Sequence, residues 1–153
     1  MRITTRAALL IAVAVGFLGI EGFQPVVASA ASCVQVYRIY YNSPGSDRGG
    51  NSSLNAEWIS LHNSCSSRRL LKAWTIRDAA GHTYTFGSSY RLGGGAYVRV
   101  HTGKGRNTRT DRYWGMSWYV WNNDADTAYL HNLHGKLVDQ CSYNNSSASS
   151  ARC

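Results

Sequence analysis

Short segments in which apolar and polar residues alternate dominate the chain after about residue 33. In the segment from Glu57 to His62, Ile59 and Leu61 fall on one side and the residues between them on the other. A period of two is typical of a strand with one buried face. The strands predicted in this way are Val34–Tyr41, Glu57–His62, Leu70–Asp78, Tyr84–Phe86, Ala96–His101, Ser117–Trp121, Thr127–Asn132 and Lys136–Tyr143.

Turn signals separate these segments. Asp78–Gly81 has the composition of a tight hairpin turn, because Gly accepts the positive φ that such turns require. Gly93–Gly95 and His134–Gly135 divide later strands, and no window of about ten residues beyond the N-terminal segment shows a helical period. The pattern predicts an all-β sandwich of eight or nine strands.

The first thirty residues have the pattern of an export signal. Arg2 and Arg6 precede the apolar stretch Ala7–Ile20, and Ala28–Ala30 gives the small-x-small cleavage pattern. The apolar stretch is shorter than the about 20 residues that a spanning helix needs, and no second one follows, so we expect a released protein with no transmembrane segment.

Cleavage after Ala30 divides the chain into a signal peptide (1–30), one domain (31–143) and a Ser/Asn-rich tail (144–153) that ends in Cys153. Cleavage after Ser32 is the nearest alternative. The order Ala30–Cys33 also imitates a lipoprotein signal, but the usual Leu three residues before the cysteine is missing. We expect the tail to be flexible and held at its end if Cys153 is paired.

Four cysteines remain in the mature part: Cys33, Cys65, Cys141 and Cys153. An even count in an exported chain predicts two disulfides. Two pairings fit a sandwich, either Cys33–Cys65 with Cys141–Cys153 or Cys33–Cys141 with Cys65–Cys153. The Cys-x-x-Cys and His-x-x-x-His spacings of zinc sites are absent from the sequence, so we expect no metal at the cysteines.

The mature chain is strongly basic. Without Arg2, Arg6 and Glu21 it has 14 basic and 7 acidic residues, a net charge of +7. Such a charge favours acidic partners, namely nucleic acid, anionic cell-wall polymers or acidic lipid headgroups. It also keeps a secreted protein soluble, so charge alone does not select among these.

Several motifs resemble the lamin tail domain family, in particular its secreted bacterial members of the actinobacterial type. They are Asn55–Asn63, Leu71–Asp78, Leu92–Gly95 with the following Tyr97–Val100, and Trp121–Ala128. The resemblance covers about Val34 to Tyr143. The Gly that precedes the Trp in the family is Ala73 here, a replacement of one small residue by another.

The resemblance implies an immunoglobulin-like β-sandwich of about nine strands. It also implies a non-enzymatic interaction or structural module, without catalytic residues or a cofactor. Together with the export signal, this predicts a secreted protein that works at or outside the cell surface. The coiled-coil rod of true lamins is absent from this sequence, so we do not expect assembly through heptads. A protein–protein module that uses a sheet edge or an apolar patch is the alternative.

A Gly-rich segment from Thr102 to Arg112 contains the candidate binding residues. Backbone N–H groups and Arg side chains in such a loop suit phosphate oxygens. The aromatic residues that follow could stack on rings of a ligand. We therefore expect polyanion binding by Lys104, Arg106, Arg109 and Arg112, with Trp114 and Trp118 as the exposed aromatic pair, whereas Trp74 and Trp121 serve the core.

The sequence also contains candidate residues for two other chemistries, Ca²⁺ binding and hydrolysis. Two oxygen-rich segments carry side chains of the kind that bind Ca²⁺, although turns select the same residues: Asp47, Asn51, Asn55 and Glu57 in one, Asn122, Asn123, Asp124 and Asp126 in the other. A small secreted hydrolase could use His101 or His134, but the Gly-x-Ser-x-Gly motif of a nucleophile elbow is missing from the sequence.

Overall fold

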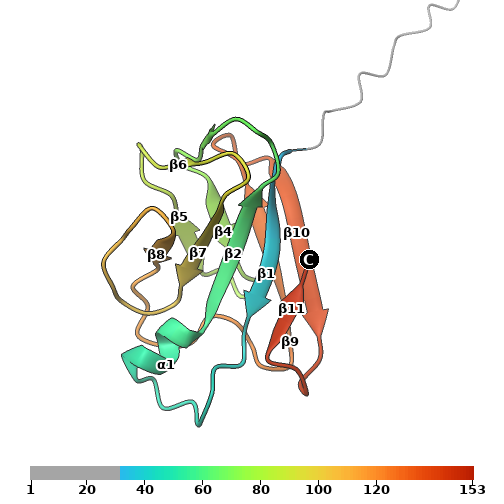
Figure 1. Cartoon of the computed structure of the whole chain (residues 1–153). Coiled ribbons are helices and arrows are strands. Elements are labelled where there is room, and N and C mark those ends of the chain that lie inside the picture. The colour runs from blue at the N-terminus through green and yellow to red at the C-terminus, as the bar shows by residue number, and fades with distance from the viewer. Residues whose placement is uncertain (1–31) are drawn as a thin grey trace, which may run out of the picture.

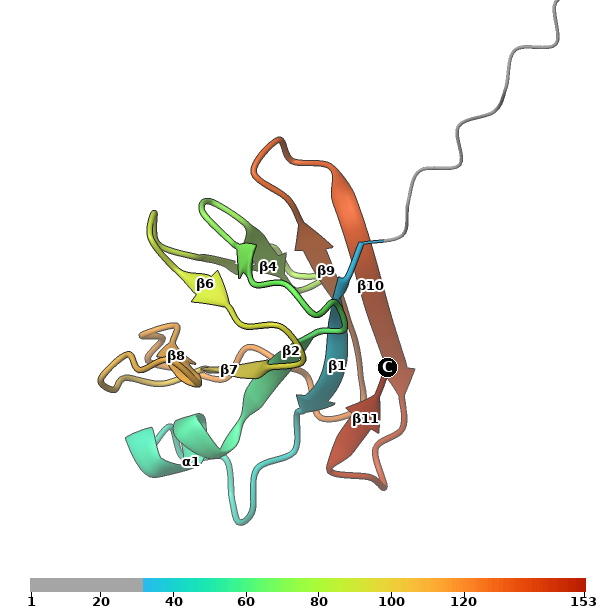
Figure 2. The same ribbon diagram turned by 45° about the horizontal axis from the view of Figure 1, so that its top comes forward.

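The computed structural model describes residues 32–153, and the predicted signal peptide lies outside this range. Two antiparallel-rich sheets pack face to face (Figures 1 and 2). The five-stranded sheet has the order β11 (Ser150–Arg152), β1 (Val34–Tyr40), β2 (Trp58–Asn63), β7 (Tyr97–His101) and β8 (Asp111–Tyr113). The four-stranded sheet has the order β10 (Leu137–Asn144), β9 (Ala125–His131), β4 (Thr75–Arg77) and β5 (Thr83–Thr85).

Two smaller elements complete the fold. A two-stranded ribbon is formed by β3 (Arg69–Leu70) and β6 (Arg91–Leu92), and Figure 2 shows β6 between β7 of one sheet and β4 of the other. The short helix α1 (Asn51–Ala56) precedes β2. Within residues 32–153, no helix has the length and apolar character needed to cross a membrane.

The core lies between the two sheets. Ile59 and Leu61 of β2 are fully buried, as are Ile76 of β4 and Leu130 of β9 on the facing sheet. The alternation seen in the sequence is therefore the alternation of inner and outer faces. This arrangement confirms the prediction of an all-β, immunoglobulin-like sandwich.

The two disulfides are Cys33–Cys65 and Cys141–Cys153, which is the first of the two predicted pairings. Their Cα–Cα distances are 5.3 and 5.7 Å. The first joins the start of β1 to the loop after β2. The second joins β10 to the residue after β11, and so links the two sheets at one edge of the sandwich. Each disulfide reduces the conformational freedom of the unfolded chain.

The predicted strand Leu70–Asp78 is instead two strands, β3 and β4, which belong to different sheets. The chain turns between them at Ala73, which has a positive φ of 56°. Trp74 N–H then donates to the Leu71 carbonyl (3.0 Å) and closes the turn. Apolar and polar residues alternate on both sides of Ala73, so the sequence pattern does not show where β3 ends and β4 begins.

Two more predictions differ from the structure. Ser117–Trp121 is a loop and not a strand, because the N–H groups of Val120 and Trp121 donate to the side chain of Glu57 (2.8 and 3.3 Å) and not to a neighbouring strand. The last part of the predicted tail is strand β11, which pairs with β1 and extends the five-stranded sheet.

Ala73 provides a test of the backbone conformation. An L-residue in the left-handed region costs roughly 1–2 kcal/mol, whereas Gly occupies this region without that penalty. Ala73→Gly should therefore raise the free energy of unfolding by up to about 1 kcal/mol, after the larger entropy of the unfolded Gly chain is subtracted. Urea denaturation measures the difference. Ala125→Gly, in strand β9, is the control and should lower stability; a loss of stability in Ala73→Gly would contradict the assigned conformation.

Candidate anion-binding site

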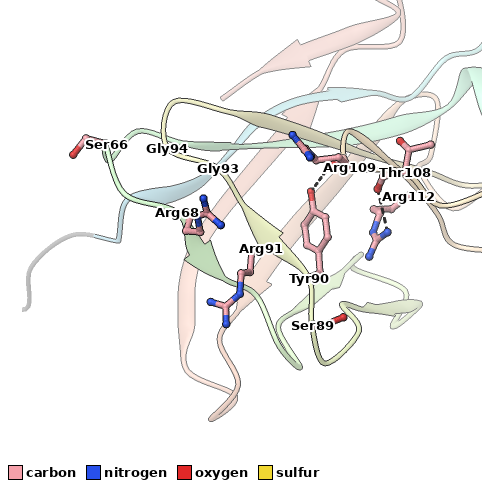
Figure 3. Close-up of a pocket in the computed structure, with 10 residues that line it drawn as sticks. All are labelled: Ser66, Arg68, Ser89, Tyr90, Arg91, Gly93, Gly94, Thr108, Arg109 and Arg112. Atoms are coloured by element: carbon pink, nitrogen blue, oxygen red, sulfur yellow. Dashed lines mark hydrogen bonds between the residues drawn. The ribbon is translucent and has the colours of Figure 1, made fainter.

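A groove of about 550 Å³ lies between the β3–β6 ribbon and the connection from β7 to β8. Figure 3 shows the side chains that line it. They are Ser66, Arg68, Ser89, Tyr90, Arg91, Gly93, Gly94, Thr108, Arg109 and Arg112. We call this the arginine groove.

The lining of the arginine groove carries only positive charge. Four arginines contribute to it, together with the hydroxyl groups of Ser, Thr and Tyr side chains, and no Asp or Glu lines it. Throughout residues 32–153, the ion pairs within 4.0 Å involve only histidines, His82 with Asp78 and His101 with Asp111. The guanidinium groups of the groove are therefore not neutralised by carboxylates of the described part of the chain.

Asn63 positions one wall of the groove. Its Nδ2 donates to the carbonyls of Ser67 (2.9 Å), Leu92 (3.2 Å) and Gly93 (2.9 Å), while its Oδ1 accepts from Cys65 N–H (3.2 Å). One buried amide thus fixes both the loop that carries Arg68 and the end of the strand that carries Arg91. Buried polar groups with complete hydrogen bonding specify such loop positions strongly.

Gly94 allows the floor of the groove to close. A Cβ at this position would lie 1.9 Å from the carbonyl oxygen of Ser66, so a larger residue would force the two segments apart. Gly94, within the Gly-rich run that separates β6 from β7, is therefore required by the close approach of two backbones. The sequence by itself predicts only a break between strands at this run.

Tyr90 joins the two walls. Its hydroxyl donates to the Arg109 carbonyl (2.8 Å), and the guanidinium carbon of Arg112 lies 4.2 Å from the centre of its ring. Burial raises the pKa of Tyr90 to about 12, so the hydroxyl remains a donor at physiological pH. Arg112 Nη1 also donates to the Thr108 carbonyl (3.1 Å). This bond braces the Gly-rich segment from Thr102 to Arg112, which we call the cationic loop.

The structure divides the predicted cations into two pairs. Arg109 and Arg112 line the groove, whereas Lys104 and Arg106 are exposed and do not line it. The backbone of Lys104 is held by Asn51 and Asn55, whose Nδ2 groups donate to its carbonyl (3.0 and 2.9 Å). Arg68 and Arg91 complete the groove but were missed, because no local motif marks them in the sequence.

The two predicted ligand-stacking residues also differ. Trp118 is 59% exposed but does not line the groove. Trp114 is partly buried against the core, with its ring centre 6.1 Å from that of Trp121 and 5.8 Å from that of Tyr84. The prediction of an exposed pair is therefore correct for Trp118 and wrong for Trp114, while Trp121 and Trp74 do pack in or against the core.

Glu57, one of the candidate Ca²⁺ ligands, is buried in the core. Its side chain is fully buried, and its Oε1 accepts from Thr102 Oγ1 (2.6 Å) and from the N–H groups of Val120 and Trp121 (2.8 and 3.3 Å). Burial is the main reason that the pKa of Glu57 rises to about 7. The contacts of Glu57 are those of a structural carboxyl that fixes the start of the cationic loop.

Asp126 and His101, from the second candidate Ca²⁺ segment and the candidate catalytic residues, also have partners within the fold. Asp126 accepts from Ala79 N–H (3.1 Å), and His101 contacts the Asn55 carbonyl through Nδ1 (2.7 Å) and Asp111 through Nε2 (3.0 Å). Both ring nitrogens of His101 thus have partners. Among residues 32–153, no group of three or more His, Cys, Asp or Glu side chains has an arrangement that could hold a metal ion.

Comparison with known families gives one match. The model of the lamin tail domain family matches residues 27–145, which is most of the chain. No curated protein matches the chain significantly.

Glu57 gives a pH dependence that can be measured. Its pKa is about 7 in the folded protein against an ordinary 4.5, so its contribution to stability is complete below pH 4.5 and is lost as the pH rises through 7. The unfolding free energy of the wild type relative to Glu57→Gln should therefore fall by about 3 kcal/mol between pH 4.5 and 8. Urea denaturation across this range measures it.

Asp124→Asn serves as the control for the Glu57 experiment, because the exposed Asp124 carboxylate accepts only from the neighbouring Ala125 N–H (2.9 Å). This variant should keep the pH profile of the wild type. If the difference between Glu57→Gln and the wild type stayed constant from pH 4.5 to 8, the raised pKa would be wrong.

Proposed function

The chain belongs to the lamin tail domain family, and we propose that it is a secreted interaction module whose arginine groove binds the phosphate groups of an anionic cell-envelope polymer. The family is one of non-catalytic immunoglobulin-like domains, which fits a binding role. The export signal expected for residues 1–30 and the two disulfides support a location outside the cytoplasm.

The observation that carries this proposal is the charge of the groove. Arg68 and Arg91 come from one wall, and Arg109 and Arg112 come from the other, with Tyr90 between the two pairs (Figure 3). Guanidinium groups pair with phosphate oxygens through two parallel hydrogen bonds and are less strongly hydrated than ammonium groups. A chain of phosphates that passes between the walls would meet donors on both sides.

Lys104 and Arg106 attract the polymer but do not hold it in the groove. Both are exposed on the same loop as Arg109, outside the groove. Exposed charges raise the rate of encounter with a polyanion and are screened by salt within about 10 Å at 0.1 M. They attract the polymer, whereas the groove holds it. A protein partner on an apolar patch is the alternative, and its binding would depend weakly on salt.

Co-sedimentation with cell-wall sacculi tests the proposal. The wild type should bind sacculi that retain their anionic polymers, and binding should fall steeply between roughly 50 and 500 mM salt because bound counterions are released. The double variant Arg68→Ser/Arg91→Ser should lower the affinity at least about tenfold, since each hydrogen bond to a charged group contributes roughly 1.5–3 kcal/mol.

Lys104→Ser/Arg106→Ser is the matched control, because it removes the same charge from outside the groove. It should lower the affinity much less. Equal losses in the two double variants would show that only net charge matters and would exclude the groove as the site. Wild-type binding that is unchanged by salt, or by removal of the anionic polymers, would direct attention to a protein partner.

A further inference from the structure

The outer face of the five-stranded sheet carries a second arrangement of arginines, separate from the arginine groove. Cross-strand register places Arg38 between Arg152 on β11 and Ser60 on β2, and places Ser60 beside Arg99 on β7. Because directly opposite residues of neighbouring strands lie on the same face of a sheet, these four residues form one row across it. Ile59 and Leu61, the neighbours of Ser60 along β2, point into the core.

Aromatic residues flank this row on both sides. Tyr40 is opposite Trp58 on one side, with ring centres 5.6 Å apart, and His62 is opposite Tyr97 on the other, at 4.2 Å. Tyr37 contacts Tyr97 edge to face at 4.8 Å. Two residues of a strand span about 7 Å, so each aromatic row lies about that distance from the arginine row.

A slot of about 460 Å³ opens between the rows. Ser60 forms its floor, since it is the smallest of the lining residues and only 5% exposed. The other residues that line it are Tyr37, Arg38, Trp58, Tyr97 and Arg99. The slot shares no residue with the arginine groove.

Contacts among these side chains hold them in place. The Arg99 guanidinium lies 5.1 Å from the centre of the Trp58 ring, and that of Arg152 lies 5.0 Å from the centre of the Tyr37 ring. Cross-strand aromatic pairs stabilise a sheet by themselves, which accounts for the rings but not for a row of like charges between them. Arg38 Nε is buried and has no hydrogen-bond partner in the described structure, so this row retains an unsatisfied donor.

The charge of this face is complementary to a polyanion. Asp111, next to Arg99 at the β8 edge, is the acidic neighbour that the register places at the end of the row. Its carboxylate is already engaged by His101 Nε2 (3.0 Å) and Thr110 Oγ1 (2.7 Å), and the first of these contacts is the main cause of its lowered pKa. No ion pair within 4.0 Å neutralises Arg38, Arg99 or Arg152 in the described part of the chain.

From this arrangement we infer that the outer face of the five-stranded sheet binds single-stranded nucleic acid. Bases contact Trp58 and Tyr97, and phosphates lie along the row of arginines. Aromatic side chains combined with a cationic groove are the means by which strands are held without sequence preference. A duplex conceals the faces of its bases, and an uncharged glycan would leave the arginines without partners, so the single strand satisfies both features.

Fluorescence anisotropy with a labelled single-stranded oligonucleotide tests the inference. Tyr97 is 44% exposed and Arg99 is exposed, so Tyr97→Leu and Arg99→Ser are surface changes that do not require the core to repack. Tyr97→Leu should weaken binding by about 5- to 150-fold, the range expected for the loss of one stacked base. Arg99→Ser should weaken binding and reduce its dependence on salt.

Two controls separate this face from the rest of the molecule. Trp118→Leu removes an aromatic side chain that is 59% exposed elsewhere, and Arg68→Ser/Arg91→Ser removes two charges from the arginine groove. Both should retain most of the affinity for the oligonucleotide. Conversely, Tyr97→Leu should bind sacculi as the wild type does, so failure of one proposal leaves the other standing.

Three results would overturn the inference: no binding of the single strand by the wild type, unchanged binding by both Tyr97→Leu and Arg99→Ser, or equally tight binding of the corresponding duplex. Equal competition by an acidic polysaccharide would also overturn it, because the face would then recognise charge without bases. The inference would be supported if the wild type preferred the single strand to the duplex, and if Tyr97→Leu lost this preference while Trp118→Leu kept it.

Discussion

The buried carboxyl of Glu57 is the interaction on which the arrangement of this molecule depends. It joins three segments that are distant in the sequence, since Glu57 directly precedes β2, Thr102 follows β7, and Val120 and Trp121 lie in the long loop before β9. The Thr102 N–H also donates to the Glu57 carbonyl (3.1 Å). The cationic loop starts directly after Thr102, so its position follows from a carboxyl in the core. Removal of this carboxyl from water is costly, and its raised pKa expresses that cost.

Asn63 and Asp78 also fix backbone segments through the hydrogen bonds of their buried side chains. Because these motif residues bind the protein's own backbone, the family motifs indicate a fold but no ligand. Asn63 binds the loop and the strand that carry the groove arginines, while Asp78 accepts from the N–H groups of Gly81 and His82 (both 2.7 Å) and fixes the β4–β5 hairpin. Both side chains are fully buried. The most recognisable polar residues of the sequence therefore satisfy backbone groups inside the protein, and recognition of partners is left to residues that the motifs do not include.

The parts of the fold that depend on local pattern could be predicted from the sequence, and the parts that depend on distant contacts could not. Alternation around Ile59 and the turn at Asp78–Gly81 are local, and both predictions were confirmed. The positive φ of Ala73 and the pairing of β11 with β1 depend on tertiary contacts that leave no period in the sequence. The residues of the candidate site show the same difference between local pattern and distant contacts. Arg109 and Arg112 belong to a visible cationic segment, whereas Arg68 and Arg91 join them only because the ribbon folds against that segment.

Different residues provide stability and binding in this protein. This holds for the arginine groove and for the outer face of the five-stranded sheet. The core, the buried polar groups and the two disulfides hold the sandwich together without a single Lys or Arg ion pair in the described structure. Surface ion pairs usually contribute about 0–1 kcal/mol, so their absence costs the fold little. Arginines that are not paired internally still repel one another, and a polyanion relieves that repulsion when it binds. Because no carboxylate of the described structure pairs with these arginines, their charge is available for attachment to a polyanion, and that attachment must weaken with salt.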